Sequence, residues 1–296
     1  MKWFAAILLL AFPVFMSCGD DDTASDPSGP ADNGNAEQIA YEQATAEQFA
    51  PLLVFDQDQG KQKHRCFPMD AGYWFEVRKT LPYTPDCEPA CIIENMDYVS
   101  IFLGNVPVYY QYASCDSAEY VAYWFFYGYQ PDCDVESGEH SADWEHVIVK
   151  IVDGQLARVL FFQHAGQYTK EAANPALLLS EDHPYVFVGA QSHGSYHDTG
   201  GSGGCCYWRD WRYPGPLDSW KTMKTWLNLV PLSLDDDSPE WMKCATEECW
   251  PNCCPGPLHR DTDFCDLQAC VGTDPTCDLT GDNQQGCQRT DVWGRF

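Results

Sequence analysis

Residues 123–151 contain the feature that most constrains the fold, which is a pair of apolar runs joined by an acidic loop. The runs, at 123–129 and 144–151, are rich in the aromatic and β-branched residues that favour strands. The loop between them is polar and carries aspartate, glutamate and histidine. The pattern predicts a β-hairpin with carboxylates where the loop meets the second strand.

The second strand of this hairpin places two carboxylates on one face. Side chains alternate along a strand, so Asp143 and Glu145 should point the same way as Val147, and Trp144 the other way. Like charges on a half-buried face are costly unless they are paired or bound to a cation. We therefore expect a positive group beside them, either a metal ion or a basic side chain such as Lys150 or Arg158.

The N-terminus has the pattern of an export signal. Lys2 precedes an apolar run at 3–15, which is too short for a permanent membrane helix, and Cys18 follows a small residue. The segment resembles a bacterial lipobox, which implies a signal peptide at 1–17, lipidation of Cys18 and an anchor at the bacterial cell surface or outer membrane. An ordinary secretory signal with an incidental cysteine is the alternative. Both place the protein outside the cytoplasm.

Cysteine content and charge agree with an oxidising compartment. The sequence has 16 cysteines, which favour disulfides over zinc because tight paired CxxC modules are lacking. The formal net charge is -27, which argues against nucleic acid binding because that needs basic residues to neutralise phosphates. We expect a monomer.

The remaining sequence divides into three parts. A polar, Pro- and Gly-rich stretch at 18–45 predicts a flexible linker, and 46–236 predicts the folded domain. Residues 237–296 hold eight cysteines and few aliphatic residues, so this tail should depend on cross-links. A stripe of apolar residues at intervals of three and four predicts a helix at 217–230. Predicted strands lie at 50–56, 98–103, 106–112, 119–129, 144–152, 156–164 and 185–190. The fold class is therefore a mostly β, antiparallel sandwich with flanking helices.

With these residues in view, the domain resembles the necrosis- and ethylene-inducing-peptide-like (NLP) family and, more distantly, a vacuolar-protein-sorting-type family that shares a DWEH element. The family motif GHRHDWE appears here as residues 139–145, EHSADWE, followed by a valine-rich strand. Residues 49–56, 65–71, 158–168 and 183–197 and the predicted helix that contains Trp220 resemble other family segments, so the likeness covers about residues 47–230. The chain differs at Ala142, Glu139 and Ser141, which replace a histidine, a glycine and an arginine.

The resemblance implies a function as well as a fold. Family members bind a divalent cation, and toxic members use it to engage sphingolipid head groups and breach membranes without acting as enzymes. Ca²⁺ and Mg²⁺ suit such ligands, and a histidine also admits Mn²⁺. The matched metal ligands are Asp132, His140, Asp143 and Glu145, with Asp134 as a second candidate. His164, His193 and Trp144 are candidates for the rim of a ligand site, and the alternative for the histidines is a hydrogen-bonded core role.

Three functional hypotheses follow. The favoured one is an anchored lipoprotein that binds a divalent cation and, through it, lipid head groups or glycans, with cytolysin or virulence activity. The second is a metal-dependent hydrolase that uses the same Asp, His and Glu cluster. The third is a surface adhesin without catalysis, in which salt bridges hold the acidic loop.

Overall fold

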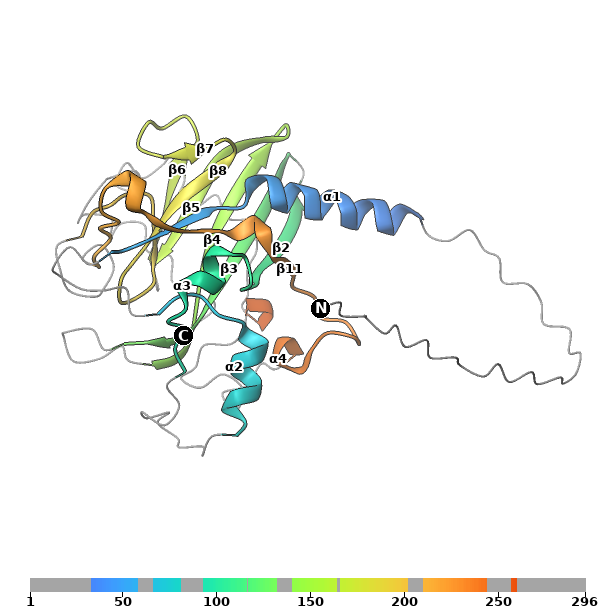
Figure 1. Ribbon diagram of the computed structural model, residues 1–296. Coiled ribbons are helices and arrows are strands. Elements are labelled where there is room, and N and C mark those ends of the chain that lie inside the picture. The colour runs from blue at the N-terminus through green and yellow to red at the C-terminus, as the bar shows by residue number, and fades with distance from the viewer. Residues whose placement is uncertain are drawn as a thin grey trace, which may run out of the picture.

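The computed structural model describes residues 33–57, 66–80, 93–115, 117–131, 140–163, 166–201, 210–243 and 257–259. These residues form two packed β-sheets with helices around them (Figure 1). The mostly β sandwich predicted from the sequence is confirmed. Each sheet contains one parallel pair, so the sheets are mixed and not purely antiparallel.

The larger sheet has six strands in the order β11-β2-β3-β4-β5-β6. Its centre is the predicted hairpin, in which β3 and β4 pair antiparallel along nearly their whole length. β11 pairs in parallel with β2 at one edge. The strands are β2 (Val108–Cys115), β3 (Ala118–Gln130), β4 (His140–Val152), β5 (Gln155–Gln163), β6 (Gly166–Glu171) and β11 (Leu229–Pro231).

The smaller sheet has five strands in the order β10-β1-β8-β7, with β9 also pairing with β8. β1 is buried along its whole length and lies between β8, which is parallel to it, and β10, which is antiparallel. The strands are β1 (Leu52–Phe55), β7 (Leu179–Ser180), β8 (His183–Val188), β9 (Ser195–Tyr196) and β10 (Lys221–Lys224).

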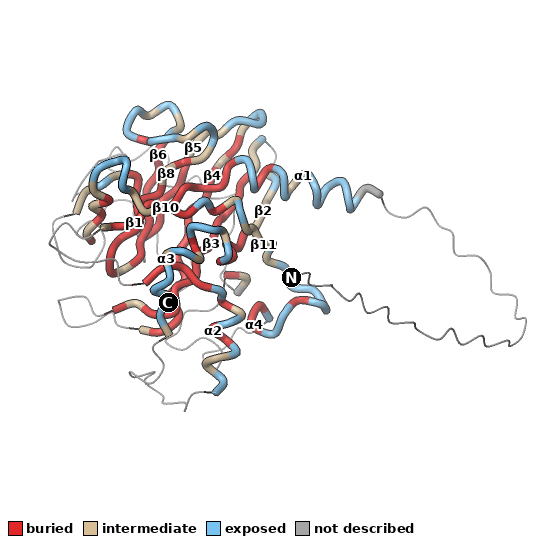
Figure 2. The backbone as a smooth tube through the Cα atoms, in the orientation of Figure 1, coloured by how far each residue is buried: buried red, intermediate tan, exposed pale blue. Residues whose placement is uncertain are grey.

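Apolar side chains are buried on both faces of the larger sheet, so its central strands are buried in Figure 2. Between the sheets, Tyr123, Phe125 and Val149 pack against Phe55 and Val188 of the smaller sheet. On the opposite face a second cluster is covered by α2 (Ala71–Arg78) and α4 (Glu240–Lys243). It includes Trp74, Trp124, Phe126, Trp144, Trp241 and Met242. Full burial of each such side chain contributes about 1.5–3 kcal/mol.

The N-terminal helix α1 (Asn33–Phe49) corrects the linker prediction. Residues 33–45 are helical because alanine, glutamate and glutamine are good helix formers. Gln38 and Gln43 also each donate a hydrogen bond to a glutamate four residues later. The helix is tied to the domain by the Tyr123 hydroxyl, which donates to the carbonyl of Ala46 over 2.7 Å. The folded domain therefore begins before residue 46.

The strand predicted at 98–103 is wrong, because these residues form helix α3 (Tyr98–Phe102). The Asp97 side chain caps its start by accepting from the backbone N–H of Val99 and the hydroxyl of Ser100. Gly104 then adopts a φ of 74°, which glycine permits and which ends the helix. Local capping thus decides the structure of a segment rich in strand-forming residues.

The helix predicted at 217–230 is also wrong. The segment forms η3 (Leu217–Ser219), β10, η4 (Thr225–Leu227) and β11. A buried strand needs hydrogen-bonding partners on both edges, and β10 supplies the second partner of β1. Side chains in β10 alternate between the core and the surface: Met223 is 1% exposed, whereas the next residue, Lys224, is exposed.

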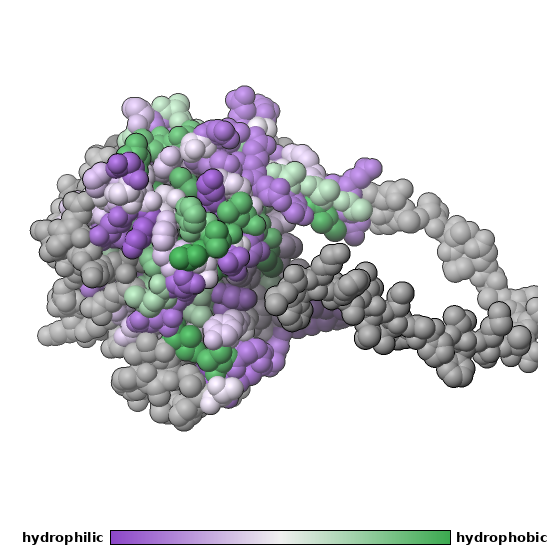
Figure 3. Space-filling model, viewed as in Figure 1, coloured by the Kyte–Doolittle hydropathy of each residue, from purple (hydrophilic) through white to green (hydrophobic). Residues whose placement is uncertain are grey.

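The tail boundary at residue 237 also needs correction, because Trp241 and Met242 of α4 belong to the core. The remaining described tail residues form η5 (Pro257–His259). No helix of the described residues is both long and apolar enough to cross a membrane. Hydrophobic and hydrophilic patches alternate over the face drawn in Figure 3. Exposed apolar residues include Val99 and Phe102 on α3 and Leu103 directly after it.

Candidate functional site

The start of β4 carries the predicted carboxylates. Asp143 lies opposite Tyr127 in the β3–β4 ladder, and Glu145 lies opposite Phe125. Both face the space between the sheets, where Asp143 is 5% exposed and Glu145 is 7% exposed. Trp144 lies in the cluster on the opposite face of the sheet, as the alternation predicts.

Asp143 is held by two histidines. Its Oδ2 lies 2.8 Å from Nδ1 of His193, and its Oδ1 lies 3.5 Å from Nε2 of His140. Burial alone would raise the pKa of the Asp143 carboxyl, but its hydrogen bonds with His140 and His193 and their charges outweigh burial and hold that pKa well below its usual range. Asp143 is therefore a buried carboxylate that remains ionised.

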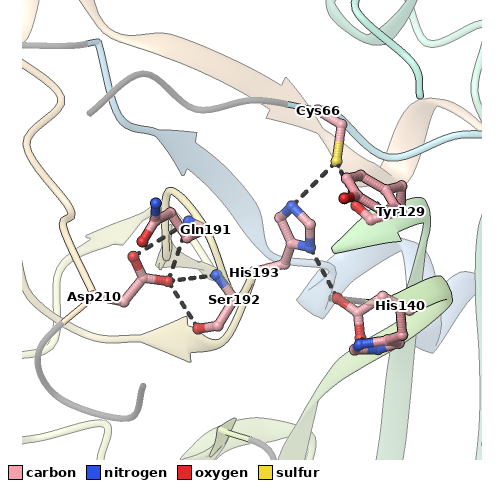
Figure 4. A network of polar contacts seen from close by, with 8 residues as sticks. Cys66, Tyr129, His140, Gln191, Ser192, His193 and Asp210 are labelled. Atoms are coloured by element: carbon pink, nitrogen blue, oxygen red, sulfur yellow. Dashed lines mark hydrogen bonds and ion pairs between the residues drawn. The ribbon is translucent and has the colours of Figure 1, made fainter. Parts of the chain in front are cut away.

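His193 connects Asp143 to a free thiol (Figure 4). Its Nε2 lies 3.1 Å from Sγ of Cys66, and that sulfur lies 3.0 Å from the carbonyl oxygen of Tyr129. The imidazole stacks on the ring of Tyr127, with centroids 4.0 Å apart and planes 4° from parallel. These contacts fix the imidazole ring and, through it, the orientation of the carboxylate.

Cys66, His193 and Asp143 follow the order thiol, imidazole, carboxylate of a catalytic triad. The environment of the thiol, however, does not suit a nucleophile. Cys66 is fully buried, and burial, with the charges of Glu94 and Asp143, raises the pKa of its thiol. A cysteine nucleophile needs a thiolate within reach of its substrate. The row Cys66–His193–Asp143 is thus a supporting network for Asp143.

A second buried aspartate holds the turn that carries His193. Asp210 accepts hydrogen bonds from the backbone N–H groups of Gln191 and Ser192 and from the Ser192 hydroxyl, all within 3.2 Å. Burial raises the pKa of this carboxyl, although the hydrogen bonds from Ser192 oppose the rise. A Cβ at Gly189 would lie 2.2 Å from Oδ2 of Asp210, so the turn requires a glycine there.

Arg212 anchors the next turn. Its guanidinium is almost fully buried, lies 3.8 Å from the centre of the Tyr196 ring and donates to Oδ1 of Asp198 over 2.8 Å. Burial would raise the pKa of Asp198, but the charge and hydrogen bond of Arg212 outweigh it and lower that pKa. The turns on either side of β9 are thereby held by charged side chains.

Two residues next to Asp143 have strained backbone angles. Ala142 has a φ of 63° and His193 a φ of 55°, and both values lie in the left-handed region that non-glycine residues rarely adopt. Such conformations are retained where the surrounding structure enforces them, and they cluster at functional sites. The strain supports a special role for the loop end of β4.

The structure places only some of the predicted site residues. His140 and Asp143 come together, and Glu145 is buried on the same face. His193 is 0% exposed and Trp144 is 3% exposed, so both lie in the interior and not at a rim. Asp132, Asp134, His164 and Cys18 lie outside the described residues.

The predicted basic partners of the carboxylates are engaged elsewhere. Arg158 pairs with Glu171, and the Lys150 ammonium lies 5.6 Å from the centre of the Tyr120 ring. The groups beside Asp143 are the two histidines. Sequence reasoning missed Cys66, Asp210 and the pairing of His193 with Asp143, because nothing in the sequence relates these distant segments.

The described residues fit a metal ion only in part. Among them, no group of three His, Cys, Asp or Glu side chains is arranged to hold one. However, Nε2 of His140 and Oδ1 of Asp143 are 3.5 Å apart. Two Ca²⁺ ligands at right angles, each about 2.3–2.6 Å from the ion, would be about 3.3–3.7 Å apart. This pair suits two neighbouring ligands, and a full set would need Glu145 and Asp132.

Comparison with solved structures finds similar folds at low sequence identity. Necrosis and ethylene inducing protein 2 from the causal agent of cocoa's witches' broom disease is 16% identical with a TM-score of 0.34, over 52% of this chain and 67% of that one. NLPPya in complex with mannosamine is 14% identical with a TM-score of 0.37, over 64% and 72%. Non-toxic HaNLP3 is 12% identical with a TM-score of 0.34, over 64% and 73%.

All three are NLP structures, the family that residues 139–145 resemble, and the likeness is one of fold. No family model matches the chain, and no characterised protein matches it in sequence.

Proposed function

We propose that this chain is a lipid-anchored surface protein that binds a divalent cation at the loop end of β4 and, through the cation, polar lipid head groups or glycans. His140, Asp143 and Glu145 would supply ligands, together with Asp132. The observation that carries the proposal is the buried carboxylate of Asp143, which is bonded to His193 through one oxygen and has Nε2 of His140 3.5 Å from the other.

The network behind Asp143 supports this assignment. His193 occupies Oδ2 of the carboxylate and leaves Oδ1 facing His140. A histidine hydrogen bond to the far side of a metal-binding carboxylate fixes its orientation, and such outer partners tune metal affinity. Ala142, which precedes Asp143, and His193, which bonds to it, both have positive φ angles. The backbone around the hydrogen bond between His193 and Asp143 therefore has a fixed conformation.

A bound cation would contribute a positive charge that attracts the hydroxyl or phosphate oxygens of a head group. The protein would exclude water with the aromatic residues beneath the site and would hold the carboxylates in place. Attachment through Cys18 would keep the domain at a membrane surface outside the cytoplasm. Membrane disruption is the activity that the sequence resemblance suggests for such a site.

The test is metal binding by the full chain with matched variants. Calorimetric titration with Ca²⁺, Mg²⁺ and Mn²⁺ should give saturable binding, and the melting temperature should rise with metal and fall with chelator. Glu145→Gln should weaken binding and reduce the thermal shift, whereas Asp218→Asn, at an exposed residue of η3, should leave both unchanged. Equal melting temperatures in chelator and in excess metal, with no binding heat, would refute the cation site.

The head-group step needs a separate measurement. Dye leakage from liposomes with glycosylated sphingolipids, compared with plain phosphatidylcholine liposomes, should require the metal and should fail in Glu145→Gln. Binding to glycolipid without leakage would retain the recognition function and exclude cytolysis. Equal behaviour toward both liposomes would exclude head-group recognition.

A further inference from the structure

A hydrophobic patch lies on the surface where α3 meets η4, near the centre of the face drawn in Figure 3. It consists of Val99 and Phe102 of α3, Leu103 directly after it, and Leu227 of η4, and each of these residues is at least 50% exposed. The two elements are in close contact, because a Cβ at Gly104 would lie 2.6 Å from Cβ of Leu227. We call these four apolar residues the α3–η4 patch. Contiguous exposed apolar side chains of this kind mark interaction surfaces.

The patch is held firmly by the fold beneath it. The hydroxyl of Tyr98 in α3 accepts from the backbone N–H of Thr222 in β10 over 2.9 Å and donates to the carbonyl oxygen of the same residue. The hydroxyl of Thr225 in η4 donates to the carbonyl of Pro51 over 2.6 Å. The apolar side chains are therefore presented on a preformed surface, which lowers the entropic cost of binding.

The surroundings of the patch differ in charge from the rest of the chain. Residues 98–112 and 219–234, which form the patch and its neighbourhood, contain two lysines and no acidic residue, whereas the whole chain has a net charge of -27. Asp97 lies at the start of α3, but its two carboxylate oxygens accept from the N–H of Val99 and the hydroxyl of Ser100. An acidic protein is repelled by anionic surfaces, so it can approach one only through a face without free carboxylates.

The two lysines lie beside aromatic rings next to the patch. The Lys221 ammonium is 5.6 Å from the centre of the Tyr98 ring, and the Lys224 ammonium is 5.9 Å from the centre of the Trp226 ring. Within the part of the chain that the structure describes, neither lysine forms an ion pair, although the chain has 44 acidic residues. Both positive charges are therefore available to an anion outside the protein.

We propose that the α3–η4 patch rests on the surface of an anionic phospholipid bilayer. Exposed leucine and phenylalanine side chains, flanked by tyrosine, tryptophan and lysine, are the composition of protein segments that lie in the membrane interface. The apolar side chains would enter the boundary between head groups and acyl chains. Lys221 and Lys224 would contact lipid phosphates, and each lysine near an anionic membrane strengthens such binding.

The inference deepens the proposed function and rests on it for the lipid anchor at Cys18. Residues 19–32 separate Cys18 from α1 and span at most about 50 Å. The other end of α1 leads directly to the patch, because the carbonyl of Ala50 bonds to His183, whose ring stacks on Trp226 of η4. An anchor at Cys18 would thus keep the patch close to the bilayer, where even a weak contact is strengthened by the high local concentration.

The patch shares no residue with the proposed cation site. The ring of Phe67 packs on Tyr98, and Phe67 follows Cys66 of the network behind Asp143, so the two sites occupy neighbouring parts of the domain. The cation ligands, however, face the space between the sheets, whereas the patch is on the surface. Each site can therefore be removed without the other.

The experiment measures binding of the mature chain, residues 18–296 with Cys18→Ser, to sedimented vesicles in the presence of chelator. This chain keeps every described residue but has neither the export signal nor a lipid. Vesicles of phosphatidylcholine with phosphatidylglycerol should bind it at least about tenfold more tightly than vesicles of phosphatidylcholine alone, since each lysine near an anionic surface contributes about fivefold. Neither vesicle contains glycolipid, so head-group recognition through a cation does not contribute.

Two pairs of substitutions test the patch itself. Leu103→Ser with Leu227→Ser should weaken binding to the anionic vesicles by at least about tenfold, because two apolar side chains no longer enter the interface. Leu178→Ser with Leu179→Ser is the matched control, since these leucines are also exposed but lie at the opposite edge of the smaller sheet, and it should bind like the parent chain. Unchanged melting temperatures will confirm that both variants fold.

The lysines give an independent measurement. Lys221→Gln with Lys224→Gln should reduce binding to anionic vesicles by about tenfold and leave binding to neutral vesicles unchanged. This variant retains the apolar patch, so it separates the charge from the apolar contact.

Several results would overturn the proposal. They are absence of vesicle binding, equal binding by the two leucine variants, and binding that requires Ca²⁺, which would assign the contact to the cation site. Self-association in sedimentation velocity that is lost in the Leu103 and Leu227 variant would instead assign the patch to a second copy of the chain. Failure of the metal titration would refute the cation site and leave the vesicle result unaffected.

Discussion

The imidazole of His193 and the carboxylate of Asp143 form a hydrogen bond across the interior, with Nδ1 and Oδ2 2.8 Å apart and both side chains almost fully buried. His193 comes from the turn before β9, and Asp143 from the start of β4. The contact therefore joins the two sheets at one end of the sandwich. It also sets which carboxylate oxygen of Asp143 remains beside His140.

The first prediction concerns this pair. His193→Ala should lower the free energy of unfolding by about 3–5 kcal/mol, because it leaves a buried carboxylate without its nearest partner. Urea denaturation monitored by tryptophan fluorescence measures the change. His183→Ala provides the comparison and should cost less, about 1–2 kcal/mol, since His183 is only half-buried, makes one hydrogen bond to the carbonyl of Ala50 and stacks on Trp226.

A double variant distinguishes the loss of this hydrogen bond to a buried carboxylate from simple loss of packing. If the unpaired charge causes the loss, Asp143→Asn in the His193→Ala background should restore part of the stability. Strict additivity of the two substitutions would show that the pair contributes nothing beyond packing.

A second prediction tests the turn that presents His193. Gly189→Ala places a Cβ 2.2 Å from Oδ2 of Asp210, so the aspartate must shift and its hydrogen bonds to Gln191 and Ser192 must weaken. We expect a loss of about 1–3 kcal/mol in the free energy of unfolding. Hydrogen exchange should accelerate at the backbone N–H of Ser192. Gly154→Asn is the control, because a Cβ there meets nothing within 4 Å and asparagine tolerates the φ of 71°.

Cys66 provides a third prediction. Its thiol is 0% exposed and burial raises its pKa, so it should resist alkylation in the folded protein. Iodoacetamide labelling followed by peptide mass spectrometry should find Cys66 unmodified under native conditions and modified in denaturant. In the Cys66→Ala variant the same peptide lacks the thiol, so the comparison shows which labelled peptide contains Cys66. Rapid native labelling would instead mean that the thiol is accessible and would reopen a nucleophilic role for the Cys66–His193–Asp143 row.

Strand alternation made much of this hairpin predictable. The side chains of Asp143 and Glu145 point into the space between the sheets and Trp144 into the buried cluster on the opposite face, because strand geometry alone makes neighbouring side chains alternate. The sequence could not reveal that His193 and Cys66 would meet Asp143. Those three residues lie far apart in the chain, and only the packing of one sheet on the other brings them together.

The predictions for residues 33–45, 98–103 and 217–230 were wrong for the opposite reason. In each case the local sequence pattern did not by itself decide the structure of the segment. The apolar spacing of residues 217–230 suits a helix, yet β1 needed a partner on its open edge and Met223 entered the core from β10. At residues 98–103 the capping side chain of Asp97 outweighed strand propensity. At residues 33–45 the helix-forming residues were present, but the polar composition suggested a linker; docking of Tyr123 on Ala46 holds the helix to the domain.

The last prediction uses pH to test the Asp198–Arg212 pair. The pKa of Asp198 is lower in the folded protein than its ordinary value of about 3.9, because Arg212 outweighs the effect of burial. A carboxyl whose folded pKa is lowered contributes stability above its unfolded pKa and loses that contribution as the pH falls toward the folded value. Asp198→Asn should therefore cost about 1–2 kcal/mol at pH 7 and clearly less at pH 3, measured by urea denaturation of both proteins at each pH. Asp218→Asn controls for the loss of one negative charge. A difference between wild type and Asp198→Asn that stays constant between the two pH values would show that the carboxylate charge does not stabilise this turn, and that Asp198 acts only through the shape of its hydrogen bonds.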